Sequence, residues 1–111
     1  MATALVSTLE MEETERGTTL DVTLHGTLDI ETAQEFRKRV RAALDRGVKD
    51  FVIDLREVGF CDAPGAGALV GLLKRVHDRD GTLRLLLTRG HPVLDLLSRL
   101  GVEDLFSVTG Q

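Results

Sequence analysis

The sequence predicts a single α/β domain over residues 1–111, in which a mixed β-sheet packs against helices. Its apolar residues alternate as in strands in some segments and recur at helical spacing in others, in the order β-β-α-β-α-β-α-β. A length of 111 residues allows one hydrophobic core and is too short for two. Apolar residues make up 42% of the chain and charged residues 29%, as is typical of soluble domains.

Two strands are expected near the N-terminus. The residues that share one face of the first strand are Leu5, Ser7, Leu9 and Met11. The alternating apolar residues of the second strand are Leu20, Val22 and Leu24. The polar stretch 12–18 between them contains Gly17, which suits a turn, so an antiparallel pair is the simplest arrangement.

An amphipathic helix is predicted over residues 30–46, with Asp29 at its N-cap and Gly47 after its last turn. Its apolar residues are Ala33, Phe36, Val40, Ala43 and Leu44. Its clustered basic residues are Arg37, Lys38, Arg39 and Arg41. Because these charges alternate with apolar positions, we interpret them as a solvated helix face rather than a binding patch.

A short β-favouring run at 51–53 lies between two aspartates and suits a central strand that is buried on both faces. A second helix is expected over residues 66–77, and Gly81 is expected to terminate it. The apolar stripe of this helix is Ala66, Leu69, Val70, Leu73 and Val76. The spacing therefore predicts another strand–helix unit.

A further strand is expected over residues 83–87, and residues 105–108 are expected to close the sheet. Between them, Pro92 follows His91 and opens a last helix that ends at Gly101. The apolar side of that helix is Val93, Leu94, Leu96, Leu97 and Leu100. Because strand–helix–strand crossovers make neighbouring strands parallel, the complete sheet is expected to be mixed.

The segment 60–67 reads FCDAPGAG: a strand ends in an aspartate, a tight loop follows, and glycines open a helix. This order is typical of a loop that contacts a partner or a ligand. Asp62 could be a catalytic acid, a phosphorylated aspartate or a helix cap. We favour the cap, because a carboxylate there accepts bonds from free helix amides and opposes the helix dipole. Ala63 and Pro64 have no polar side-chain atom, so the loop is expected to shape a surface rather than to run chemistry.

Neither a cofactor nor a metal is predicted. The glycines of residues 65–71 could let backbone amides hold a phosphate, but no acid follows the next strand, and no Gly-Lys-Ser/Thr sequence is present. The residues that could suggest nucleophilic or zinc chemistry match no ligand spacing; they are Cys61, His25, His77 and His91. We therefore expect that the protein is not an enzyme. We expect the side chain of Cys61 to be packed rather than reactive.

The net charge of −4 argues against a nucleic-acid partner, which would require a basic stripe. A single cysteine excludes an internal disulfide and fits a reducing compartment. The first ten residues lack a basic start followed by a long apolar core, and no apolar run approaches the ~20 residues of a membrane helix. A cytoplasmic protein without membrane insertion is expected.

Four segments, in this order and spacing, resemble the STAS domain family and within it the small antagonists of anti-sigma factors. Residues 24–29, LHGTLD, are similar to the family's L-x-G-x-L-D, and residues 52–62, VIDLREVGFCD, to its v-v-D-L-s-x-v-x-f-i-D. Residues 81–85 and 96–102 resemble its G-g-x-l-x-L and l-l-x-x-x-G-l. The resemblance covers about 20–108 and implies a bacterial-type signalling and transcription regulator that acts by protein–protein interaction.

The resemblance also implies a partner, an ATPase-fold serine kinase that doubles as an anti-sigma factor. The family's kinase phosphorylates the second serine of a D-S-S-G-L loop, and this breaks the complex. Here the loop reads DAPGA, so the phosphoacceptor position falls on Pro64, and no Ser or Thr lies between Thr32 and Thr82. A regulator without this switch is implied. Its expected partner-binding residues are Asp29, Asp62, Ala63, Pro64, Gly65, Ala66 and Gly67.

Other functions remain open at this point. The chain could be a divergent STAS module that binds a transporter-associated or stress-signalling assembly, or a small-ligand or nucleotide sensor that uses the glycine-rich helix start. The loop could also have drifted in a domain whose working face lies elsewhere. The oligomeric state is open, because residues 20–24 and the N-terminal strand could form an edge that pairs with another copy.

Overall fold

A mixed sheet of five strands, in the order β1-β2-β3-β4-β5, forms the centre of the structure, a computed structural model that describes residues 8–110. The elements are β1 (Leu9–Arg16), β2 (Thr19–Leu28), α1 (Ala33–Asp45), β3 (Asp50–Cys61), α2 (Ala63–Asp78), β4 (Thr82–Leu86), α3 (Pro92–Arg99), a short 3-10 helix η1 (Glu103–Leu105) and β5 (Ser107–Thr109). β1 and β2 pair antiparallel, and every other neighbouring pair is parallel. The predicted fold class is confirmed.

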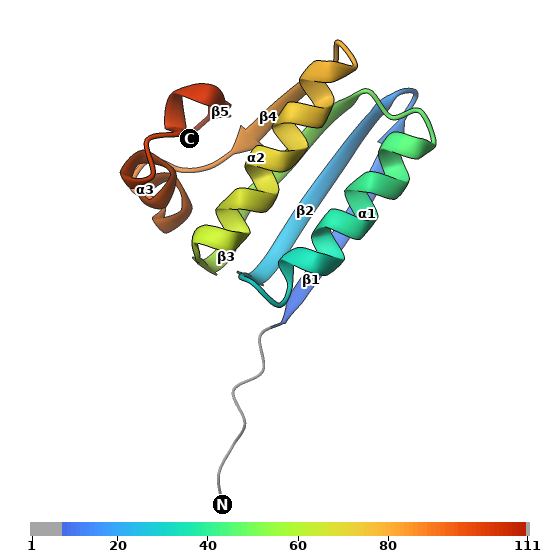
Figure 1. The fold of residues 1–111 in the computed structure, drawn as a ribbon. Helices are drawn as coiled ribbons and strands as arrows, with labels where there is room; N and C mark the ends of the chain where they lie inside the picture. Colours follow the sequence, from blue (N-terminus) through green and yellow to red (C-terminus); the bar gives the residue numbers. More distant parts are fainter. Residues whose placement is uncertain (1–7, 111) are drawn as a thin grey trace, which may run out of the picture.

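Helices α1 and α2 lie side by side over one face of the sheet (Figure 1). The core lies beneath them, and its largest fully buried side chains include Phe36, Phe51, Ile53 and Leu69. On β3 the side chains alternate between this core and the opposite face, where Val52 and Asp54 remain partly exposed. The expectation of a β3 buried on both faces is therefore wrong, because α1 and α2 cover the same face.

β3 is much longer than the run at 51–53 that its apolar residues suggested. It pairs with β4 only as far as Asp54, while its pairing with β2 continues to Cys61 through two register shifts. Beyond the end of β4, the ring of His91 lies against this second half of β3, with Nε2 3.3 Å from the carbonyl oxygen of Arg56. The extension moves the end of β3 to the loop that precedes α2.

Both long helices begin elsewhere than predicted. α1 begins at Ala33 rather than at residue 30, because a separate turn occupies residues 29–32. α2 begins at Ala63 rather than at Ala66, with Pro64 inside its first turn, where the missing N–H costs no helical bond. Gly81 does follow α2, but Asp80 is the residue with positive φ, at 56°.

The buried faces of the helices also differ in part from the predicted stripes. On α2, Ala68 and Leu72 are buried in addition, and Val70 is only partly buried. On α3, the expected apolar residue Leu100 lies past the helix end and is 45% exposed.

The C-terminal segment and the sheet edges correct the prediction further. Residues 105–108 do not form one strand: Leu105 belongs to η1 and is exposed, while β5 begins at Ser107. β2 is paired on both sides, so residues 20–24 cannot pair with another copy; within the described residues the edges are β1 and β5. Leu5 and Ser7 lie outside the described residues. No helix in the described part of the chain has the length and hydropathy of a membrane span.

Candidate functional site

The candidate site lies where β2 and β3 end side by side. Leu28 pairs with Cys61 in the parallel register, and the amide of Asp62 donates to the carbonyl oxygen of Leu28 over 3.3 Å. Each strand is followed at once by an aspartate, so Asp29 and Asp62 lie at neighbouring strand ends. This brings the two loops that the sequence analysis singled out to one end of the sheet.

Asp62 is the N-cap of α2, as predicted. Its Oδ1 accepts from the amide of Gly65 at 2.8 Å, and its carbonyl oxygen accepts from the amide of Ala66 at 2.9 Å. Its Oδ2 accepts from the amide of Ile30 at 3.1 Å, so one carboxylate joins both loops. The carboxylate thus occupies the position at which a phosphate at the glycine-rich helix start would bind, which weakens the nucleotide-sensor interpretation.

Asp29 does not cap α1 but closes the turn before it. Its Oδ1 accepts from the amides of Glu31 at 2.9 Å and of Thr32 at 3.0 Å. The hydroxyl of Thr32 in turn accepts from the amide of Asp29 and donates to the carbonyl oxygen of Thr27. Asp29 is buried, with 9% exposure, so its carboxylate stabilises the turn and is little accessible to a partner.

The predicted site residues therefore fall into two groups. Ala63, Pro64 and Gly67 are exposed, whereas Gly65 and Ala66 are buried against the sheet. A Cβ atom on Gly65 would lie 2.2 Å from the carbonyl oxygen of Leu28, so only glycine permits this close approach. The accessible part of this segment is the start of the first turn of α2, Ala63 and Pro64, which we call the Ala63-Pro64 tip.

Two exposed apolar residues beside the aspartates were missed in the sequence analysis. Ile30, directly after Asp29, is 62% exposed, and Phe60, two residues before Asp62, is 55% exposed. Large apolar side chains on the solvent side of such loops commonly mark an interaction surface. The available signal was their place next to the two strand-ending aspartates.

Cys61 is half-buried beneath the same loop. Burial, reinforced by the charges of Asp62 and Asp29, raises the pKa of its thiol to about 12. The side chain is packed and protonated at neutral pH, which makes it a poor nucleophile. Among residues 8–110, no group of three or more His, Cys, Asp and Glu side chains is placed to hold a metal ion.

Comparison with known proteins identifies the family of this domain. The STAS domain family matches residues 9–110. An anti-sigma-B factor antagonist of Staphylococcus aureus strain NCTC 8325 is 30% identical over 104 residues, which cover 90% of this chain and 92% of that protein.

Solved structures show the same fold. An anti-sigma factor antagonist from Mycobacterium paratuberculosis superposes with a TM-score of 0.80 at 16% identity, over 94% of this chain and 87% of the other. The unphosphorylated form of the anti-sigma factor antagonist SpoIIAA superposes with a TM-score of 0.75 at 19% identity, over 94% and 90% of the two chains.

Proposed function

Since the chain belongs to the STAS domain family, we propose that it is a non-catalytic regulator that binds an anti-sigma factor through the first turn of α2 and the strand ends beside it. The expected partner is an anti-sigma factor that is also an ATPase-fold serine kinase, acting in the cytoplasm. The observation that carries the proposal is the exposed Ala63-Pro64 tip, held over the ends of β2 and β3 by the bonds of Asp62. The name of the Staphylococcus aureus relative, an anti-sigma-B factor antagonist, supports this class of partner.

The proposed surface combines the Ala63-Pro64 tip with the exposed apolar side chains of Ile30 and Phe60. Apolar residues at the centre of an interface contribute most when they are fully desolvated by the partner. Pro64 restricts the backbone of the tip, and the capping bonds of Asp62 hold it in place, so little ordering entropy is lost on binding. The surface is therefore preorganised for a protein partner.

The proposed regulator is not switched by phosphorylation of this loop. SpoIIAA has been solved in phosphorylated and unphosphorylated forms. In the present chain neither Ala63 nor Pro64 carries a hydroxyl, and the hydroxyl of Thr32 in the neighbouring turn is bonded to the carbonyl oxygen of Thr27. A phosphate on this segment would add about −1.5 to −2 charges beside Asp62 and would repel the partner. Because this chain cannot take up that phosphate, the proposed complex stays intact in the presence of the kinase and ATP.

The test is binding to purified anti-sigma kinases from the same genome, measured by calorimetry with and without ATP. We expect one of them to bind the wild-type chain with unchanged affinity after incubation with ATP. The double variant Ala63→Ser/Pro64→Ser is expected to accept phosphate, seen as a mass increase, and then to lose affinity. Ala42→Ser, which places a new serine at an exposed position of α1, is the matched control and should stay unmodified.

Two outcomes would contradict the proposal. If no such kinase binds and a transporter-associated or stress-signalling protein is captured through the same loop, the chain is a STAS module of another system. If a kinase binds but Phe60→Ala and Ile30→Ala leave the affinity unchanged, the interface lies on another face of the domain.

A further inference from the structure

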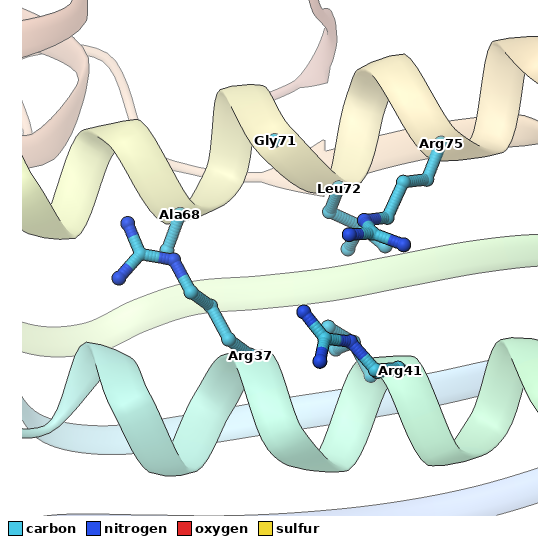
Figure 2. A pocket seen from close by; sticks show the side chains of 7 residues that line it. Arg37, Arg41, Ala68, Gly71, Leu72 and Arg75 are labelled. Carbon is cyan, nitrogen blue, oxygen red and sulfur yellow. The ribbon is translucent and has the colours of Figure 1, made fainter.

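A groove between α1 and α2 carries a second, separate feature. It forms a partly open cavity of about 210 Å³ between the two helices (Figure 2). The residues that line it are Arg37, Val40, Arg41, Ala68, Gly71, Leu72 and Arg75. No acidic residue lines this cavity, although acidic residues outnumber basic ones in the chain, 18 to 14.

We propose that this groove binds a compact, multiply charged anion of the phosphate class, such as a diphosphate group. Its guanidinium groups come from both walls: Arg37 and Arg41 from α1, and Arg75 from α2. In Figure 2 the side chains of Arg41 and Arg75 extend toward each other across the groove, and Arg37 reaches from α1 toward Ala68. Guanidinium groups bind phosphate oxygens in a bidentate manner, so this arrangement suits an anion with several oxygens.

These arginines differ from the two neighbouring arginines of the same helix region that are paired with glutamates. On α1 itself, Arg39 pairs with Glu13 of β1, and just past its end Arg46 pairs with Glu15. Within residues 8–110, the side chains of Arg41 and Arg75 form no hydrogen bond or ion pair. The only bond of Arg37 there is a long one, 3.5 Å, to the carbonyl oxygen of Pro64. Like charges gathered around one cavity repel, and a bound anion would relieve that repulsion.

The groove also has room for such an anion. The wall formed by α2 includes two small residues, Ala68 and Gly71, and a Cβ atom on Gly71 would have no neighbour within 4 Å. The floor is formed by the buried side chains of Val40 and Leu72, which exclude water from one side of the cavity. Charge-assisted bonds are stronger where water is partly excluded.

The limited volume of the groove favours a small anion over an acidic segment of a protein. Three guanidinium groups line one cavity of limited volume, so one polyvalent group could reach several of them, whereas a peptide carboxylate carries a single charge. Asp45 borders a neighbouring hollow with Arg37 and Arg41 on the outer side of α1 and pairs with neither. The proposal does not depend on the partner proposed above.

The experiment is isothermal titration of the full chain with inorganic pyrophosphate in a phosphate-free buffer of low ionic strength. We expect saturable binding of one pyrophosphate per chain. Arg41→Gln and Arg75→Gln should each weaken it about tenfold, as expected for loss of a charge-assisted bond. The control Arg84→Gln removes the same charge from an exposed position of β4, whose neighbours Leu83 and Leu85 are buried, and should leave the affinity unchanged.

A second variant tests the cavity itself. Gly71→Leu fills the groove without removing a charge, and leucine is a better helix former than glycine, so the chain should remain folded by circular dichroism while pyrophosphate binding is lost. A parallel titration with adenosine diphosphate tests whether the ligand is a free diphosphate or a diphosphate ester. Equal affinity for the two compounds indicates that only the diphosphate group is recognised, and tighter binding of adenosine diphosphate indicates an ester.

The proposal is overturned if pyrophosphate gives no saturable heat, or if Arg84→Gln weakens binding as much as Arg75→Gln, since the attraction would then be a diffuse charge effect. It is also overturned if a glutamate-rich peptide binds the groove more tightly than pyrophosphate, which would indicate a protein partner. Because no anti-sigma factor is present in these titrations, their failure leaves the proposed function unaffected.

Discussion

The two strand ends at the candidate site use the same residue type in different ways. After β3, Asp62 caps a helix that begins at the next residue, and the chain leaves the sheet as the exposed Ala63-Pro64 tip. After β2, Asp29 is buried and closes a turn, and its helix begins only at Ala33. Asp62 therefore holds the exposed start of α2 in place, whereas Asp29 stabilises the neighbouring turn from a buried position. The difference shows that a cap-like sequence pattern does not by itself indicate which loop is exposed.

Cys61 lies beside both aspartates. The largest effect that we expect is a difference in the reactivity of its thiol between the folded and the unfolded chain. With a pKa near 12, compared with 9.0 for an ordinary thiol, its thiolate fraction at pH 8 is very low. Alkylation by iodoacetamide should be slower in the folded chain than in urea by at least about a hundredfold. Because the folded pKa is raised, the thiol stabilises the fold fully below pH 9 and loses this contribution as the pH rises toward 12.

The variants Asp62→Asn and Asp29→Asn sharpen this prediction. Each removes one of the charges that raise the pKa of the thiol, and burial, the largest cause, remains. We therefore expect only a small acceleration of alkylation in either variant. Equal rates for folded and unfolded wild-type chains would contradict the packed position of Cys61.

The next largest effect is expected from Gly65→Ala, which breaks the junction between the two strand ends. The added Cβ would lie 2.2 Å from the carbonyl oxygen of Leu28, so the start of α2 must move away from the sheet. We expect a loss of about 3 kcal/mol in the free energy of unfolding, measured by urea denaturation.

Gly71→Ala is the matched control within the same helix. A Cβ atom there meets nothing within 4 Å, so this variant should gain about 0.5–1 kcal/mol from helix propensity. Equal stabilities of Gly65→Ala and Gly71→Ala would refute the close packing of α2 on β2.

Asp29→Ala should destabilise the domain more than Asp62→Ala. Removal of the buried carboxylate leaves the amides of Glu31 and Thr32 without their acceptor, at a cost of about 2 kcal/mol. Thermal and urea unfolding measure this loss. Equal losses for Asp29→Ala and Asp62→Ala would contradict the buried position of the Asp29 carboxylate.

Asp62→Ala should destabilise the domain least among the destabilising variants, by about 1 kcal/mol, because its side chain is partly exposed and water can replace its bonds to the amides of Gly65 and Ile30. Its effect on binding the proposed partner should be larger than its effect on stability, since the Ala63-Pro64 tip loses its anchor. Asp62→Asn keeps an acceptor oxygen and should restore most of the stability.

Much of the fold was predictable from local patterns. The order of elements and the mixed sheet follow from apolar periodicity and from the geometry of strand–helix–strand crossovers. The cap at Asp62 was also predictable, because an aspartate before a proline-containing first turn satisfies amides within a few residues of itself.

The site could be predicted only in part. Ala63 and Pro64 are exposed but lie in the first turn of α2 rather than in a loop, Gly65 and Ala66 are buried, and Ile30 and Phe60 were missed. Exposure at these positions depends on how β2 and β3 end relative to each other, which is a property of strand register and not of any short segment.

The sequence alone determined the order of the elements, the cap of α2 and the absence of a hydroxyl at Ala63 and Pro64, because each depends on residues close together in the chain. Only the tertiary structure decided that Asp29 is buried and that Arg41 and Arg75 face one groove, whereas Arg39 is neutralised by Glu13. The arginines alternate along one helix and looked like a uniform solvated face. Which of them is paired depends on the element that packs beside each one, β1 on one side of α1 and α2 on the other.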